Sequence, residues 1–255
     1  YISTDQQNEF NELIPYLEEI KNALNASRDK RSDLMPRFST ELDNSIIDLR
    51  ERVKVVMEMA NDPELFKCET SCGEAAKILV LLIAKTDEIK DLSDSYNSYQ
   101  SIMGRRKVKF DDVKELCNLV KHEKLLWETL SEWNVKMAEW FNMNFNEIDL
   151  DIFSVEISDF REKALTAFNY LQKNPVAENL ITMIEGFLNL LPVIKDLNNP
   201  ALKDEHKTSI DALLGGKIFK NGDYLLRTLY ELNAFTHVEG IANVAAHASN
   251  EQKLL

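Results

Sequence analysis

Glycine and proline are scarce in this sequence, which contains seven glycines and six prolines among 255 residues. β-Sandwiches and β-barrels need a turn at roughly every 8–12 residues, and those turns draw heavily on both residue types. The scarcity therefore argues against either architecture. A hydrophobic content of 44% is enough for a sizeable core, so a disordered chain is not expected either.

Cysteine and long apolar runs are also scarce. The three cysteines are an odd number without the spacing of a disulfide framework, which favours a reducing compartment. The longest apolar run, residues 78–84, is much shorter than the roughly 18 residues of a membrane-spanning helix. We expect a cytoplasmic protein without a membrane partner. Because the sequence starts at Tyr1 and stops at Leu255 within a helical pattern, we also expect it to be a piece of a longer protein.

Basic residues are outnumbered by acidic ones, 30 to 43, which gives a net charge of −13. This charge disfavours nucleic acid and anionic membranes as partners, since both would repel most of the surface. One basic run, Arg105, Arg106, Lys107 and Lys109, stands out from this background. The first three are candidate interaction residues for an acidic partner, although a solvated loop between helices is the favoured interpretation.

Apolar residues recur at steps of three and four along nearly the whole chain, as in amphipathic helices. We expect an all-α fold: an elongated array of about eight antiparallel helices in two successive helical bundles, residues 1–106 and 107–255. A break of the last helix near Asn233 is left open. The expected helices cover roughly residues 3–24 with Ser3 as cap, 42–59, 73–103, 111–141, 151–174, 175–197, 200–214 and 224–255.

A proline-containing stretch, "LLPVIKDLNNPALKDEH" from Leu190 to His206, interrupts this regular pattern. Pro192 removes one helical hydrogen bond and can kink its helix. Asn199 and Pro200 are predicted to stop that helix and to begin the next one. We therefore expect a rigid structural joint at Pro192, Asn199, Pro200 and His206. An ordinary helical hairpin could use the same residues at its turn, so that alternative stays open.

Metal-binding motifs were sought and none is predicted. A di-iron helical bundle requires Glu-x-x-His pairs, and none of the four histidines has a glutamate three positions earlier. The stretch "HEKLL" at His122 has no second histidine and so is not a zinc-protease motif. Cys68 and Cys72 could share a metal on a helix, but ordinary thiols are the better interpretation because no further ligands lie nearby in the sequence.

Catalytic and nucleotide-binding motifs are missing as well. The Gly-Gly-Lys in "DALLGGKI" is not a phosphate-binding loop, because Asp211 and Ile218 stand where glycine and a hydroxyl residue are required. No serine is flanked by glycines, and no pair among the 43 acidic residues can be singled out for acid–base chemistry. We expect neither a catalytic site nor a bound cofactor in this segment.

The three tryptophans all fall in one predicted helix. All three are expected in the core rather than in a binding site. Trp133 and Trp140 share a face, whereas Trp127 lies about 120° away from Trp133 on an ideal helix. If an aromatic residue contacts a second domain, Trp127 is the candidate. A spectrin-type array should repeat its tryptophan once per unit, so this grouping disfavours such an array.

Three stretches of the second half occur in a familiar order: "KLLWETLSEWNVKMAEWFNMNFNEIDLD", "FLNLLPVIKDLNNPALKDEH" and "YLLRTLYELNAFTHVEGIANVAAHASNEQKLL". This series resembles the start of the linker region of dynein heavy chains, the axonemal members more than the cytoplasmic one. The likeness covers roughly residues 122–255. The last stretch matches the family pattern at Leu229, His237, Glu239, Ile241, Val244, Ala248 and Glu251.

One departure from that family lies at the joint, where Glu205, His206 and Lys207 replace the usual Arg-His-Trp. A lysine in place of the large aromatic residue removes an expected packing anchor. Residues 1–106 fit the helical end of the dynein stem only in general character.

The resemblance implies a mechanical role. In dyneins the linker lies across a ring of AAA+ ATPase modules, bends and straightens during the ATP cycle, and passes force to the stem. This chain would be a non-catalytic stem–linker segment of a ciliary or flagellar microtubule motor, with ATP and magnesium bound in the ring. The implied partners are that ring, dynein intermediate or light chains, and neighbouring heavy chains of the axoneme. The alternative is an unrelated helical scaffold or tethering protein.

Overall fold

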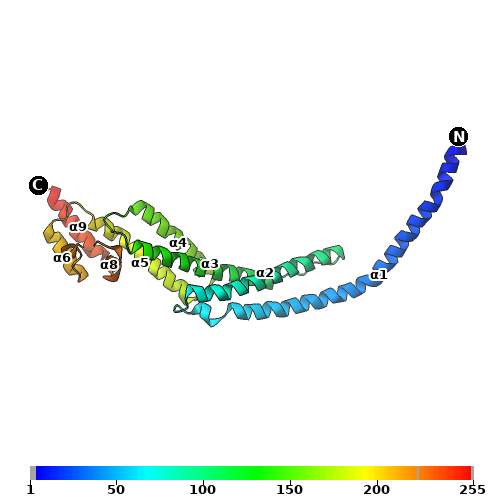
Figure 1. The fold of residues 1–255 in the computed structure, drawn as a ribbon, viewed down its shortest axis with the longest axis horizontal. Coiled ribbons are helices and arrows are strands. Elements are labelled where there is room, and N and C mark those ends of the chain that lie inside the picture. The colour runs from blue at the N-terminus through cyan, green and yellow to red at the C-terminus, as the bar shows by residue number, and fades with distance from the viewer. Residues whose placement is uncertain (1–3, 223, 254–255) are drawn as a thin grey trace. The chain divides into compact units, whose positions relative to one another are not determined.

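The computed structural model describes residues 4–222 and 224–253, and every regular element within them is a helix (Figure 1). The predicted all-α fold is therefore confirmed, with one isolated β-bridge between Asn144 and Leu225. The helices are α1 (Thr4–Ala60), η1 (Pro63–Phe66), α2 (Cys72–Ile102), α3 (Asp111–Trp140), α4 (Leu150–Tyr170), α5 (Pro175–Leu197), α6 (Asp204–Leu214), α7 (Ile218–Asn221), α8 (Leu226–Glu231), η2 (Ala234–Thr236) and α9 (Val238–Lys253).

The chain forms two compact units, each built from two stretches of sequence. The first unit comprises Tyr1–Met57 and Lys85–Leu116, and the second comprises Glu58–Ala84 and Cys117–Leu255. Helices α1 and α2 therefore contribute residues to both units, as does α3. The predicted division of the chain into 1–106 and 107–255 stays a prediction.

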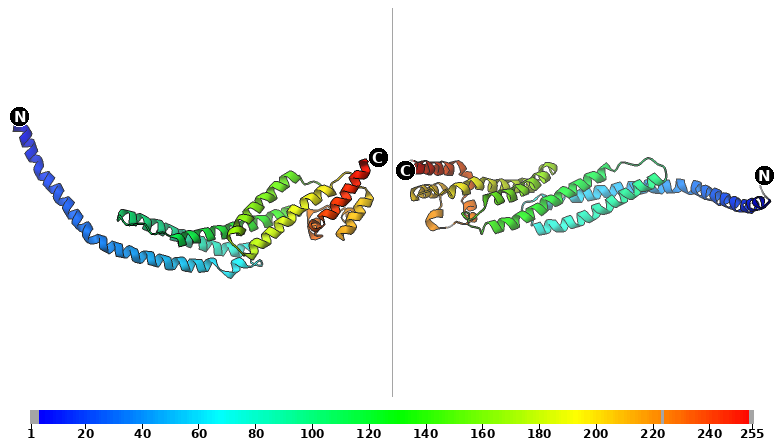
Figure 2. Two further views of the ribbon diagram at one scale, coloured as in Figure 1. Left: turned by 180° about the vertical axis from the view of Figure 1, so that it is seen from behind. Right: turned by 90° about the horizontal axis from the view of Figure 1, so that it is seen from above.

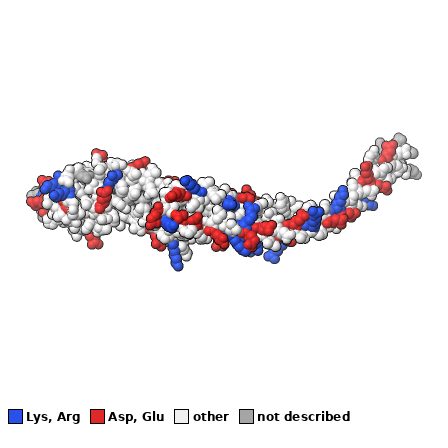
Figure 3. All heavy atoms as spheres, turned by 60° about the horizontal axis from the view of Figure 1, so that its bottom comes forward, with Lys and Arg blue, Asp and Glu red and all other residues white. Residues whose placement is uncertain are grey.

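A single helix, α1, replaces the two helices predicted before residue 60, so that prediction was wrong. Pro15 and Pro36 lie inside α1, and each removes only one backbone donor from a stretch otherwise rich in helix-forming residues. No glycine occurs in this helix to end it. The predicted cap Ser3 lies outside the described residues. Along α1, basic and acidic side chains are interspersed (Figure 3).

In the first unit, the apolar stripe of α1 is buried only toward its C-terminal half. Leu42, Ile46 and Leu49 are buried, whereas Leu17 and Leu24 are exposed although they belong to the same helical repeat. Ion pairs between Arg52 and Glu88 (2.6 Å) and between Arg105 and Asp43 (2.7 Å) link α1 to α2 and to the loop after it. The helical period of the sequence therefore does not predict which part of the apolar stripe is buried against another helix.

The second unit is organised around a cluster of aromatic rings from α3, α4, α5 and α8. The ring of Trp133 is fully buried and lies 5.1 Å from Phe187, 5.4 Å from Phe160 and 5.5 Å from Trp140, each nearly perpendicular to it. The ring of Tyr230 also packs against Phe187, at 5.1 Å between ring centres. Edge-to-face contacts of this kind stabilise a core beyond simple burial. The prediction that Trp133 and Trp140 are core residues is confirmed.

Capping residues explain where α4 and α5 begin. The side chain of Asp149 accepts the amides of Asp151 and Ile152 at the start of α4, and Asn174 does the same for α5. Pro175 opens α5, as predicted. Helix α4 ends at Tyr170 rather than near residue 174, because Lys173 adopts a positive φ of 68° and Asn174 already serves as a cap.

The C-terminal elements required further corrections. Helix α6 begins at Asp204 rather than at Pro200, and α7 was not predicted at all. The end of α6 before Gly215 is confirmed, with that glycine in the left-handed conformation (φ 66°). The open question near Asn233 is resolved, since its φ of 52° separates α8 from η2 and α9. Helices α6 and α9 lie side by side near the C-terminal end of α5 (Figure 2).

Truncation of the central ring tests the aromatic cluster. Trp133→Ala is expected to lower the free energy of unfolding by about 3–5 kcal/mol, because it leaves a cavity among three rings. Val135→Ala is the matched control, since Val135 is 60% exposed on the same helix. Urea unfolding of the 255-residue chain, followed by far-ultraviolet circular dichroism, measures both. Equal destabilisation by the two variants would contradict the assignment of Trp133 to the core.

One charged residue, Glu123 of α3, is fully buried in the second unit. Neither of its carboxylate oxygens has a hydrogen-bond partner among the described residues. Loss of hydration penalises the ionised form, so burial raises the pKa of Glu123 from 4.5 to about 8. The side chain is therefore a neutral acid at pH 7.

This burial makes stability depend on pH. Because the pKa in the folded chain exceeds that in the unfolded chain, the folded chain binds more protons between about pH 4.3 and pH 8. Stability should therefore fall as pH rises through this range, by at most about 1.4 kcal/mol per pH unit. Glu123→Gln should flatten the dependence and exceed the unaltered chain in stability above pH 8. Glu128 is exposed on the same helix, so Glu128→Gln is the control. If Glu123→Gln and the unaltered chain had identical urea midpoints at both pH 5 and pH 8.5, this account would be refuted.

Candidate functional site

The predicted joint is the corner formed by residues 198–203 between α5 and α6, and two asparagine side chains hold it. Asn198 Nδ2 donates to the carbonyl oxygen of Phe145 at 3.1 Å. Asn199 Nδ2 donates to the carbonyl oxygen of Ala245 at 3.2 Å and to Ser249 Oγ at 2.8 Å. Asn199 thereby ties the corner to α9, forty-six residues further along the chain.

The same asparagine shapes its own turn. Asn199 Oδ1 accepts the amide of Ala201 at 3.0 Å, in the manner of an Asx turn. This turn occupies the residues that were predicted to begin the next helix, which explains why α6 starts only at Asp204. Pro200 is exposed within the turn.

Pro192 lies apart from this corner in the sequence. It is exposed on α5, and the helix continues past it to Leu197. Buried Val193 and Ile194 follow it directly, so the apolar face of the helix is kept through the proline. Of the four predicted joint residues, the structure brings Asn199 and His206 into contact with α9 through their side chains.

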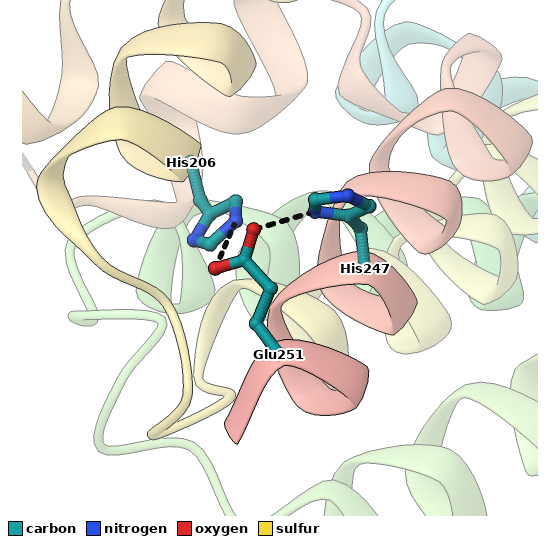
Figure 4. A group of neighbouring side chains, drawn as sticks. All are labelled: His206, His247 and Glu251. Carbon is teal, nitrogen blue, oxygen red and sulfur yellow. Dashed lines mark ion pairs between the residues drawn. The ribbon is translucent and has the colours of Figure 1, made fainter. Parts of the chain in front are cut away.

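His206, the third residue of α6, is 8% exposed and belongs to a charged cluster with Glu251 and His247 of α9 (Figure 4). Its Nδ1 accepts the amide of Lys203 at 3.2 Å, while its Nε2 lies 3.7 Å from Glu251 Oε2. His247 Nδ1 lies 3.3 Å from the other carboxylate oxygen, Oε1. Lys203 Nζ reaches Glu251 Oε2 at 3.2 Å. The hydrogen bond from Lys203 lowers the pKa of Glu251, and the charges of Lys203 and the two histidines act in the same direction.

The residue that departs from the dynein pattern, Lys207, retains an aromatic contact. Its ammonium group lies 5.8 Å from the ring centre of Phe219 on α7, a cation–π arrangement. Both residues line a hollow of about 720 Å³ beside α6 and α7. Asp211 closes one wall of this hollow by accepting the amides of Phe219 and Lys220. The ammonium group of Lys207 therefore lies beside an aromatic ring at the lining of this hollow.

The other predicted interaction residues fall in different surroundings. Trp127 is 3% exposed and lines a hollow of about 360 Å³ together with residues of α2. Arg105 is half-buried and donates to Asp43 Oδ1 at 2.7 Å and to the carbonyl oxygen of Ser39 at 3.3 Å. Arg106 and Lys107 are exposed. An interaction through these four residues stays a prediction.

Two residues of the corner cluster, His247 and Glu251, were not singled out by the sequence as site residues. They lie four positions apart, which places both on one face of α9. In the Glu-x-x-His pairs of di-iron bundles the glutamate precedes the histidine, whereas here Glu251 follows His247. The stretch "HASNE" carries the signal, although only the fold brings His206 to it.

These features define an all-helical protein whose helices α6 and α9 are fastened at a corner by side-chain contacts. The family model for dynein heavy chain, N-terminal region 2, matches residues 113–255. The chain belongs to the dynein heavy chain family, in its N-terminal region.

Individual relatives agree with this assignment. The chain is 26% identical to human dynein axonemal heavy chain 6 over 246 residues, which is 96% of this chain and 6% of that protein. It is 24% identical to human dynein axonemal heavy chain 2 over 84% of its length, covering 5% of that protein. The dynein beta chain of the flagellar outer arm from Chlamydomonas reinhardtii is 22% identical over 67% of this chain and 4% of its own length. The chain thus spans about a twentieth of these relatives, and the likeness to human dynein axonemal heavy chain 6 extends over most of the first hundred residues.

No helix in the described part of the chain is long and apolar enough to cross a bilayer.

Removing the Asn199 amide tests the corner. Asn199→Ala eliminates three hydrogen bonds and leaves the Ala245 carbonyl without this donor, so we expect a loss of about 1–3 kcal/mol in the free energy of unfolding. Asn250→Ala on the exposed face of α9 is the control and should change stability by less than about 0.5 kcal/mol. Thermal and urea unfolding of both variants provide the comparison. A stability of Asn199→Ala equal to that of the control would show that these bonds do not hold the corner.

Proposed function

We propose that this chain is a non-catalytic, force-transmitting segment at the stem–linker junction of an axonemal dynein heavy chain. The observation that carries the proposal is the match of residues 113–255 to N-terminal region 2 of dynein heavy chains. The relatives are axonemal or flagellar dyneins by name, so we place this chain in the axoneme of a cilium or flagellum.

Its packing suits a mechanical element. Force passes through a segment only if the segment resists deformation, and close-packed rings have few alternative arrangements. Trp133, Phe160 and Phe187 join the three long helices α3, α4 and α5 in this way, and Asn199 fastens the corner that follows. We propose that the corner moves with its neighbours as one body rather than acting as a hinge.

In this proposal the chemistry lies elsewhere in the same heavy chain. ATP and magnesium bind in the AAA+ ring, and this segment contacts the ring on one side and the stem on the other. Dynein intermediate chains, light chains or neighbouring heavy chains are the further partners. The residues most accessible for such contacts include Arg106 and Lys107, which are exposed.

A helical scaffold or tether is the second candidate function. It is favoured by the exposed apolar residues Leu13, Leu17, Ile20 and Leu24 of α1, which continue a helical stripe without burial. A stripe of this kind can bind another amphipathic helix. Such binding is compatible with a stem segment, whereas the scaffold function alone would need no ATPase ring.

The test is a double substitution, Asn199→Ala with Pro200→Ala, in the complete heavy chain. Loosening the corner should slow microtubule gliding on a motor-coated surface while ATP hydrolysis continues, because force is then lost between ring and stem. Asn250→Ala in the same heavy chain is the control and should glide at the unaltered velocity. Unchanged gliding of the double variant would contradict force transmission through this corner and would leave the scaffold function.

A further inference from the structure

The cluster at the α6–α9 contact has the composition of a metal site that none of the dynein assignments above requires. Within the part of the chain that the structure describes, one group of histidine, cysteine and carboxylate side chains is arranged to hold a metal ion: His206, His247 and Glu251. One ligand atom from each lies within 4.8 Å of the other two. The carboxylate of Glu251 lies between the two imidazole rings, with one oxygen toward each (Figure 4).

We propose that His206, His247 and Glu251 bind one divalent transition metal ion, with zinc as the best fit, and that the ion fastens α6 to α9. Two imidazoles and one carboxylate are a ligand set that zinc uses with a water as fourth ligand. The proposal goes beyond force transmission and does not depend on it.

The distances suit a small tetrahedral ion. Zinc–nitrogen and zinc–oxygen bonds of about 2.0–2.2 Å put neighbouring ligands roughly 3.3–3.5 Å apart. Glu251 Oε2 lies 3.7 Å from His206 Nε2, and the other carboxylate oxygen, Oε1, lies 3.3 Å from His247 Nδ1. With Oε2 as the ligand, His247 must move toward that oxygen and toward His206, and its exposed side chain is able to rotate. Calcium and magnesium fit less well because both prefer oxygen ligands.

Placement of the ligands on rigid elements also favours binding. His247 and Glu251 are one turn apart on α9, so the helix itself sets their separation. His206 is held in place by burial, since it is only 8% exposed. A site that is partly arranged beforehand loses less conformational freedom when the ion arrives.

Two existing interactions must change on binding. His206 Nδ1 accepts the Lys203 amide, so the neutral ring carries its proton on Nε2, the atom that faces Glu251. When zinc takes Nε2, that proton leaves to water and another is taken up on Nδ1, so the ring stays neutral and the bond to the Lys203 amide is lost. The ammonium group of Lys203 also withdraws from Glu251 Oε2, where it competes with the ion.

The experiment is a zinc titration of the metal-free 255-residue chain by calorimetry at pH 7.5, with cobalt(II) absorption to report the coordination geometry. We expect saturable binding of one ion and the intense visible bands of tetrahedral cobalt. His247→Ala and Glu251→Gln should each weaken binding at least about tenfold, since loss of a direct ligand exceeds the effect of losing an outer partner. His237→Ala, which removes a histidine outside the cluster, should bind as the unaltered chain does.

Lys203→Met provides a variant with the opposite expectation. It removes the competing ammonium group while keeping the length of the side chain, so zinc should bind more tightly. The backbone amide resonance of Lys203 should shift on zinc addition in the unaltered chain, because its acceptor on His206 becomes protonated. Circular dichroism of each variant verifies that the helices are intact.

Three results would overturn the proposal. The first is the absence of saturable one-to-one binding of zinc. The second is affinity that is unchanged in His247→Ala or reduced as much by His237→Ala. The third is equal or weaker binding by Lys203→Met, which would place the ion away from Glu251 Oε2.

Discussion

The packing of Phe187 between the rings of α3 and α8 is the contact on which the second unit depends. The ring of this α5 side chain lies 5.1 Å from Trp133, 5.6 Å from Trp140 and 5.1 Å from Tyr230. A ring in this position fixes both the separation and the rotation of the helices around it, because a perpendicular neighbour tolerates little sliding. This arrangement sets the direction of α5, which ends at Leu197, directly before the corner.

At the corner the chain changes direction by means of polar contacts rather than apolar ones. Apolar packing alone is not directional, whereas hydrogen bonds have preferred angles. A sharp turn between two helices therefore needs hydrogen-bond donors and acceptors in defined orientations. Asn198 and Asn199 supply them, one toward the loop after α3 and the other toward α9. Their amide groups satisfy backbone carbonyls of elements distant in sequence, which joins the turn to the core that precedes it. Residues 113–255, which match the dynein family model, contain both the aromatic cluster and this corner.

Local physics made much of this fold predictable and tertiary contacts made the rest unpredictable. The start of α5 follows from Asn174 and Pro175, a cap and a first-turn proline that act within a few residues. The start of α6 did not follow from Pro200, because the Asn199 side chain captured the next amide and delayed the helix. The sequence marked His206 as a joint residue, yet its partner Glu251 is 45 positions away and only the folded chain brings it near. Periodicity likewise could not show that Leu24 of α1 stays exposed.

Two kinds of tie hold α6 and the corner to α9, and they respond differently to their surroundings. The bonds of Asn199 are neutral and half-buried, so salt and pH should leave them nearly unchanged. The contacts of Glu251 are charged and exposed to solvent, and their contribution is screened by salt and small in water. A metal ion in place of Lys203 would convert this second, weak tie into a strong one without altering the first. The corner is thus held in every condition by Asn199, while the cluster around Glu251 is the part whose strength the surroundings can set.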